Sequence, residues 1–105
     1  MGELLKDKVA IITGGAGGIG SRIARAYARE GARVVVASRK RENLDVIVDE
    51  IVASGGEAIA VATDVTNPED VEALVQATRE SFGLADIMVN NAGGVFWSGL
   101  LETSV

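Results

Sequence analysis

The chain has 105 residues and a formal net charge of −5, and 48% of its residues are hydrophobic. This length allows one small globular domain, and an acidic chain without a block of Lys and Arg is a poor candidate for binding nucleic acid. The sequence contains no Cys and no His, which excludes disulfides, a Cys nucleophile and a His general base, and removes the two commonest zinc ligands. We therefore expect no metal site.

The first third of the chain is predicted to form a strand, a helix and a second strand. Residues 8–13 (KVAIIT) and 33–38 (RVVVAS) are nearly all apolar, as expected for strands covered on both faces. Five glycines fall within residues 14–20, directly before a helix predicted over about 19–30. Gly31 is positioned to end this helix in a left-handed conformation.

The elements that follow repeat this alternation. Apolar residues at helical spacing predict a helix over about 42–54, and residues 57–63 (EAIAVAT) predict a third strand. Asn67-Pro68 marks the start of a third helix, which extends to about residue 82, because Asn is a favoured cap and Pro a favoured first residue. Residues 86–90 (DIMVN) predict a fourth strand, and residues 91–105 are predicted as a loop.

Alternating strands and helices with short connections predict a parallel sheet with helices on both faces. The fold class is therefore α/β. We expect a Rossmann-like, doubly wound half-domain with a four-stranded sheet of order 3-2-1-4 and three helices. Residues 1–105 would form this one half-domain.

The glycine-rich segment at residues 13–20, TGGAGGIG, is the main chemical signal. It contains G-x-G-x-x-G between a predicted strand and a predicted helix, where glycines let the backbone approach a pyrophosphate at the helix N-terminus. A Walker loop would need Gly-Lys-Ser/Thr, whereas Gly20 precedes Ser21 and Arg22. The alternative is a glycine-rich turn without a ligand, which the strand and helix context disfavours.

The end of the second predicted strand carries Ser38, Arg39, Lys40 and Arg41, and the first acid, Glu42, already belongs to the next helix. A carboxylate at this point would bind the ribose hydroxyls of NAD, whereas cations accommodate the 2′-phosphate of NADP. The pattern favours NADP(H) over NAD(H). An ordinary solvated charge cluster is the alternative.

Two further motifs follow strands three and four. Asp64-Val65 lies at the carboxyl edge of the sheet, where Asp64 either binds an adenine amino group or forms a turn, and spacing alone leaves both open. Residues 90–94, NNAGG, could pass close to a ribose, although Asn- and Gly-rich turns are common.

In this order and spacing, TGxxxGIG, Asp64-Val65 and NNAG at residues 90–93 resemble the short-chain dehydrogenase/reductase family over essentially the whole chain. The resemblance implies an oxidoreductase that moves hydride between NADP(H) and an alcohol or carbonyl. It implies that the pyrophosphate is lined by Gly14, Gly18, Ile19 and Gly20, and that Ser38 and Arg39 occupy the NADP-selective positions. It also implies that Asp64 and Val65 flank the adenine and that Asn91, Ala92 and Gly93 lie along the ribose. Thr13, at the start of the motif, is also expected to be a cofactor-binding residue.

The family's catalytic Ser and Tyr-x-x-x-Lys have no counterpart in these residues. Tyr27 is the single Tyr, position 31 is Gly rather than Lys, and Tyr27 falls on the inner face of a helix. We therefore assign no catalytic residue and expect no turnover of a small-molecule substrate by the isolated chain. The alternatives are a non-catalytic nucleotide-binding or protein-interaction module and a folded truncation remnant without activity.

The fourth predicted strand would form a bare sheet edge, which predicts a homodimer or higher homo-oligomer joined through that edge. No apolar run approaches the roughly 18–20 residues needed to cross a bilayer. The first residues lack the apolar core of a signal peptide. We expect a cytoplasmic protein without membrane or nucleic-acid partners.

Overall fold

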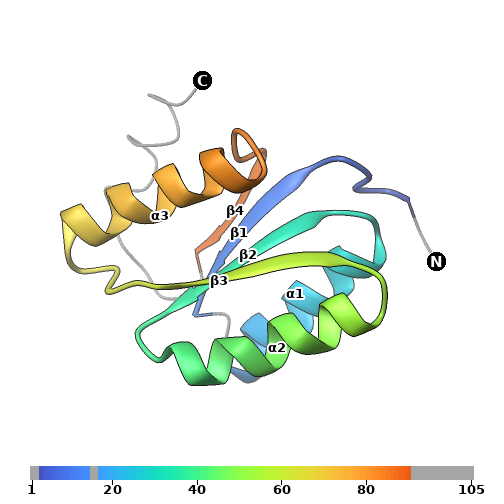
Figure 1. Ribbon diagram of the computed structural model, residues 1–105, viewed down its shortest axis with the longest axis horizontal. Helices are drawn as coiled ribbons and strands as arrows, with labels where there is room; N and C mark the ends of the chain where they lie inside the picture. Colours follow the sequence, from blue (N-terminus) through green and yellow to red (C-terminus); the bar gives the residue numbers. More distant parts are fainter. Residues whose placement is uncertain (1–2, 15–16, 91–105) are drawn as a thin grey trace.

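The computed structural model describes residues 3–14 and 17–90. These residues form four strands and three helices in strict alternation (Figure 1): β1 (Val9–Thr13), α1 (Gly18–Arg29), β2 (Arg33–Ser38), α2 (Arg41–Ala53), β3 (Glu57–Ala62), α3 (Pro68–Ser81) and β4 (Ile87–Asn90). The predicted element order is confirmed.

The four strands form one parallel sheet in the order β3-β2-β1-β4. In its central register, Val35 of β2 lies between Ile11 of β1 and Ile59 of β3, and Ile11 also pairs with Met88 of β4. The predicted topology is therefore correct. The order reverses between β1 and β4, and in parallel sheets ligands bind beside such a reversal.

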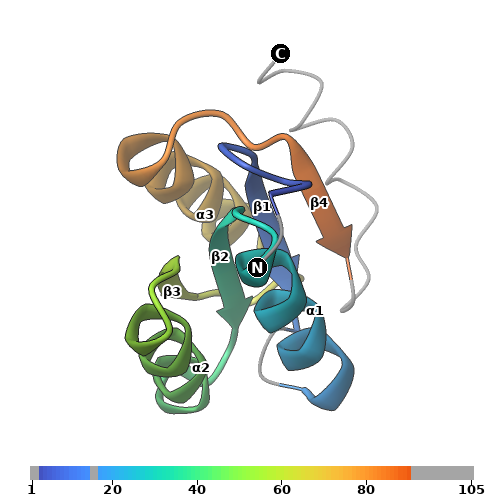
Figure 2. The same cartoon turned by 90° about the vertical axis from the view of Figure 1, so that its right-hand side faces the viewer.

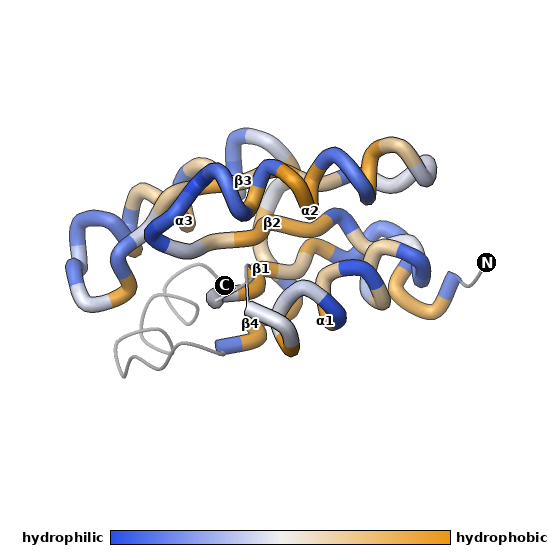
Figure 3. The backbone as a smooth tube through the Cα atoms, turned by 90° about the horizontal axis from the view of Figure 1, so that it is seen from below, coloured by the Kyte–Doolittle hydropathy of each residue, from blue (hydrophilic) through white to orange (hydrophobic). Residues whose placement is uncertain are grey.

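Helices cover both faces of the sheet, with α1 and α2 on one side and α3 on the other (Figure 2). Successive side chains of a strand point to opposite faces. Val34 and Val36 accordingly join the core beneath α1 and α2, whereas Val35 and Ala37 join the core beneath α3. Both faces of β2 are thus buried, which explains why it is an unbroken apolar run between helices that alternate polar and apolar residues (Figure 3).

The element boundaries differ from the predicted ones by at most one residue. The structure begins α1 at Gly18 and α2 at Arg41, one residue earlier than predicted, and the strands are each one residue shorter where they differ. The predicted start of α3 is confirmed, because the Asn67 side chain accepts a hydrogen bond from the Glu69 backbone N–H. Gly31 has φ +95°, so the predicted left-handed end of α1 is also correct.

Among the described residues, β4 pairs with β1 alone. Its start is fixed by Asp86, whose carboxylate accepts from the Val9 N–H at 2.9 Å and whose own N–H donates to the Val9 carbonyl at 2.8 Å. The side chains of Ile87, Met88 and Val89 are half-buried. The predictions for residues 91–105 lie outside the described residues.

Replacing Leu74 tests the packing of α3. Leu74 is fully buried between α3 and the sheet, so Leu74→Ala should lower the free energy of unfolding by about 2–5 kcal/mol through lost burial and the cavity left behind. Leu84→Ala makes the same chemical change at a side chain that is 51% exposed and should cost under about 1 kcal/mol. Urea unfolding followed by circular dichroism measures both, and equal losses would contradict the described core.

Candidate nucleotide-binding site

A cavity of about 530 Å³ lies at the carboxyl ends of β1, β2 and β3. This volume is within the range of small-molecule and cofactor sites. The lining residues come from the turns after the three strands and from the first turn of α2: Gly14, Gly17, Ser38, Arg39, Lys40, Asn43, Thr63, Val65 and Thr66. The cavity therefore occupies the sheet edge where nucleotides bind in open α/β folds.

The turn from β1 to α1 brings bare backbone to the cavity wall. Gly14 has φ +66°, a left-handed conformation that side chains disfavour, and its N–H donates to the Ala37 carbonyl at 2.8 Å. The Gly17 N–H in turn donates to the Gly14 carbonyl at 3.0 Å. A Cβ atom added to Gly18 would meet nothing within 4 Å, so the start of α1 is accessible to a ligand.

The N-terminus of α1 has no side-chain cap, because Gly17 occupies the cap position. The first turn of the helix also contains no acid. By contrast, α3 has Asn67 as its cap and two acids in its first turn. The first N–H groups of a helix and its dipole favour an anion. The exposed glycine backbone beside them leaves room for a phosphate. Of the two residues that follow Gly18, Ile19 is 66% exposed and Gly20 is buried.

Cations gather where β2 ends. Arg39 and Lys40 line the cavity, and the Ser38 hydroxyl accepts from the Lys40 backbone N–H at 3.3 Å. Arg41 is instead paired with Asp45 on α2, at 3.6 Å. In the part of the chain that the structure describes, the lining residues include two cations and no carboxylate. The wall is thus suited to an anionic ligand.

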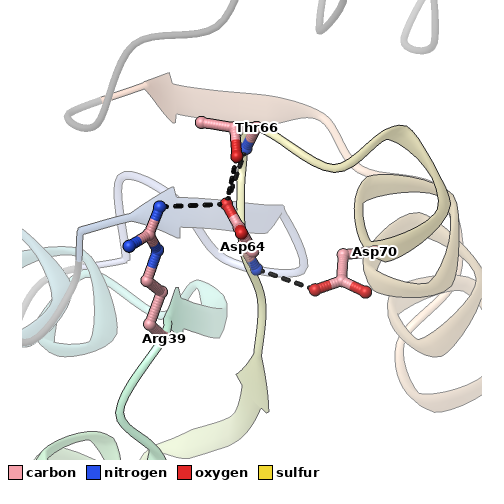
Figure 4. A network of polar contacts seen from close by, with 4 residues as sticks. All are labelled: Arg39, Asp64, Thr66 and Asp70. Atoms are coloured by element: carbon pink, nitrogen blue, oxygen red, sulfur yellow. Dashed lines mark hydrogen bonds and ion pairs between the residues drawn. The ribbon is translucent and has the colours of Figure 1, made fainter.

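Asp64 organises the turn after β3 (Figure 4). Its Oδ1 accepts from the Thr66 hydroxyl at 2.6 Å, the Thr66 backbone N–H at 2.9 Å and Nη2 of Arg39 at 3.3 Å. The backbone N–H of Asp64 donates to Oδ2 of Asp70 at 2.9 Å. The Thr66 hydrogen bonds, assisted by the Arg39 charge, hold the pKa of the Asp64 carboxyl below its ordinary value. The turn-forming role of Asp64 is confirmed, and the adenine contact stays a prediction.

Of the predicted site residues that the structure describes, four line the cavity. Gly18, Ile19 and Gly20 form a run that directly follows the lining residue Gly17, and Asp64 lies between two lining residues in the sequence. Gly14, Ser38, Arg39 and Val65 line the cavity. Thr13 does not, because its fully buried side chain donates toward β4, to Oδ1 of Asn90 at 3.2 Å and the Val89 carbonyl at 3.4 Å. Its hydroxyl thus joins β1 to β4. Asn91, Ala92 and Gly93 lie outside the described residues.

Five lining residues were missing from the predicted set: Gly17, Lys40, Asn43, Thr63 and Thr66. Gly17 and Lys40 carried a signal, since one belongs to the glycine motif and the other to the cation cluster. Asn43 on α2 and Thr66 in the turn before α3 carried none, because their approach to the cavity depends on how the helices pack. In residues 3–14 and 17–90, no group of potential ligands gathers that could hold a metal ion.

The described helices also bear on membrane association. None of α1, α2 and α3 combines the length and the apolar character needed to span a bilayer.

A doubly wound parallel sheet with a glycine-rich turn, an uncapped helix N-terminus and a cationic cavity at its carboxyl edge defines a nucleotide-binding α/β protein. The family model for short chain dehydrogenases matches residues 8–104. The chain therefore belongs to the short-chain dehydrogenase/reductase family, whose members bind nicotinamide cofactors.

Individual relatives agree with this assignment. An uncharacterized oxidoreductase of Mycobacterium tuberculosis is 46% identical over 100 residues, which cover 95% of this chain and 38% of the relative. The crystal structure of a hydroxysteroid dehydrogenase from Escherichia coli is 43% identical with a TM-score of 0.82, covering 86% of this chain and 38% of that one. A metagenomic short-chain oxidoreductase in complex with NADP is 42% identical with a TM-score of 0.79, covering 85% and 40%. The chain thus spans about two fifths of their length.

Removing the Thr66 hydroxyl tests the cause of the lowered Asp64 pKa. Thr66→Val should raise the pKa of Asp64 toward its ordinary value of 3.8, because the largest contribution to the lowering is lost. The ¹³C chemical shift of the Asp64 carboxyl, followed against pH, measures the change, and carboxyl signals remote from position 66 serve as internal controls.

The same variant has a consequence for acid stability. A lowered pKa contributes stability that is present above the ordinary value and lost as the pH falls through the folded-state value. The Asp64 contribution is therefore lost below about pH 3.8, and Thr66→Val should make the stability less dependent on pH in that range. An unchanged Asp64 titration in the variant would contradict the assigned hydrogen bond.

Proposed function

We propose that this chain binds NADP(H) at its adenosine and phosphate end, as the cofactor-binding part of an NADP-dependent short-chain oxidoreductase. Residues 1–105 would form one NAD(P)-binding half-domain of such an enzyme. The observation that carries the proposal is the cavity beside the uncapped N-terminus of α1, lined by Arg39 and Lys40 and by no described carboxylate. When bound, NADP(H) would exchange a hydride with an alcohol or carbonyl compound.

The start of α1 is the proposed pyrophosphate site. The backbone N–H groups of Gly18, Ile19 and Gly20 would supply donors at the helix start, where nothing lies within 4 Å of a Cβ added to Gly18. Gly14, whose N–H already donates to the Ala37 carbonyl, would allow the pyrophosphate to approach the backbone closely. Thr13 would act indirectly, because its hydroxyl fixes β1 against β4 next to the glycine turn.

The end of β2 is the proposed 2′-phosphate site. Ser38, Arg39 and Lys40 would face the phosphate with a hydroxyl and two cations, and NAD(H) lacks the group that these cations would bind. The metagenomic relative in complex with NADP supports this preference by similarity. Lys40 makes no ion pair with any residue that the structure describes, so its charge is available.

The adenine and its ribose would occupy the remaining walls. Val65 offers an apolar surface in the cavity, and Asp64 precedes it at the end of β3. Asn91, Ala92 and Gly93 are proposed to lie along the ribose, a role inferred from the family motif alone. Substrate recognition is not assigned to any residue of this chain.

Titration calorimetry with NADP⁺ and, separately, NAD⁺ tests the cofactor site. We expect tighter binding of NADP⁺, and we expect Arg39→Ala to weaken NADP⁺ binding by about tenfold, because one charge-assisted contact with the 2′-phosphate is lost. NAD⁺ binding should change little. Arg41→Ala is the matched control. It removes the same charge two residues further along the chain, and the Arg41 side chain is paired with Asp45.

Two results would refute the cofactor assignment. Equal affinities for NADP⁺ and NAD⁺ that Arg39→Ala leaves unchanged would refute the proposed 2′-phosphate site. The absence of binding to either nucleotide would refute the nucleotide site as a whole. Losses of the same size in Arg39→Ala and Arg41→Ala would assign the preference to overall charge rather than to a contact.

We further propose that the isolated 105-residue chain self-associates through β4. The support is the pairing of β4 with β1 alone among the described residues, together with its half-buried Ile87, Met88 and Val89 side chains. Two copies related by a two-fold axis would join their β4 strands antiparallel.

Sedimentation equilibrium tests this self-association. We expect a dimer whose dissociation constant rises at least tenfold in Ile87→Lys, because a charge would replace an apolar side chain of the joining strand. Val46→Lys, on the exposed surface of α2, is the control and should leave the dimer intact. A wild-type monomer at every concentration would refute the proposal.

A further inference from the structure

The ion pair between Arg39 and Asp64 joins the ends of two neighbouring strands beside the cavity. Arg39 follows β2 and lines the cavity, whereas Asp64 follows β3 and lies next to it (Figure 4). Nη2 of Arg39 is 3.3 Å from Oδ1 of Asp64. The cation proposed to bind the cofactor's 2′-phosphate thus already has an anionic partner.

The two partners differ in how firmly they are held. Oδ1 of Asp64 accepts two hydrogen bonds from Thr66, and the Asp64 backbone is tied to Asp70. Within residues 3–14 and 17–90, the Arg39 side chain makes one polar contact, through a single nitrogen, and it is 71% exposed, against 38% for Asp64. The carboxylate is therefore the fixed member of the pair and the guanidinium is the member that can move away.

An incoming phosphate that binds Arg39 must displace this carboxylate or share the guanidinium with it. Either way, an anion beside the phosphate opposes its binding. A ligand without the 2′-phosphate has no such competition for Arg39. The geometry thus links Asp64 to the discrimination between phosphorylated and unphosphorylated ribose.

We infer that Asp64 is a specificity-determining residue of the proposed cofactor site, because its carboxylate competes with the 2′-phosphate of NADP(H) for the Arg39 guanidinium. The inference rests on the proposed function. It states that the preference for NADP(H) depends on the attraction of two cations for the 2′-phosphate and on the opposing effect of one adjacent anion. Asp64 lowers a preference that Arg39 and Lys40 create.

The size of the effect follows from the exposure of the pair. Ion pairs this exposed are weak, so releasing Arg39 should improve 2′-phosphate binding by about two- to fivefold rather than by orders of magnitude. Lys40 has no ion pair among the described residues and would bind phosphate without such competition.

Adenosine 2′,5′-bisphosphate and 5′-AMP are suitable probes, because they differ only in the 2′-phosphate. The quantity measured by calorimetry is the ratio of their affinities, which cancels any contact that Asp64 makes with the adenine. Asp64→Asn should raise this ratio by about two- to fivefold, since the amide keeps an oxygen for the Thr66 donors but has no charge. Asp64→Ser is a second uncharged replacement, which keeps the test valid if the Asn amide disturbs the turn. It should raise the ratio as well.

Two controls separate the competition from general electrostatics. Glu69→Gln removes a nearby exposed charge that does not contact Arg39, and it should leave the ratio within about 1.5-fold of wild type because screening weakens exposed charges. In an Arg39→Ala background, Asp64→Asn should no longer raise the ratio, because the shared guanidinium is gone.

Each of the other outcomes would contradict one step of this inference or the proposed function. A ratio that stays constant or falls in Asp64→Asn overturns the competition, and a fall would mean that the carboxylate positions Arg39 for the phosphate. A rise that persists without Arg39 would mean that Asp64 repels the phosphate directly. If wild type binds 5′-AMP and the ratio does not move, this inference alone fails. If neither nucleotide binds, the proposed function fails and the inference fails with it.

Discussion

All carboxyl ends of a parallel sheet lie at one edge, and the candidate site depends on this constraint. Gly14, Arg39 and Thr63 follow three different strands, yet parallel pairing brings them to one cavity wall. The pairing in turn depends on burial of both sheet faces, since strands as apolar as β1 and β2 are stable only between two layers of helices. The hydrophobic effect that forms the core therefore also assembles the site.

The site has an uneven distribution of charge. The chain as a whole is acidic, but the described cavity wall carries Arg39 and Lys40, and the adjacent helix N-terminus adds a positive partial charge. Asp64 is the nearby exception, and it is occupied by donors from Thr66 and Arg39. A protein with a net charge of −5 can still attract a phosphate, because binding depends on the local field rather than on the total charge.

The glycine turn illustrates how far local sequence can specify structure. Its spacing and its position after an apolar strand are visible in residues 13–20, and the structure confirms the strand and the helix that follows. The left-handed conformation of Gly14 is a finding of the structure. Thr13 shows the limit of that reasoning. It belongs to the same motif, but its hydroxyl donates to the Val89 carbonyl of β4, a partner 76 residues further along the chain that no local pattern identifies.

The amino-acid sequence alone was enough to predict the alternation of strands and helices, the parallel order 3-2-1-4, the glycine-rich turn after the first strand and the cation cluster after the second. These features depend on apolar periodicity, glycine spacing and capping residues, which are properties of neighbouring residues. The pairing of Arg39 with Asp64, 25 residues away, was not predictable from the sequence. The same holds for the positions of Asn43 and Thr66 in the cavity wall. Such contacts depend on the register of β2 against β3 and on the placement of α2, and no local pattern encodes where two separately packed side chains will meet.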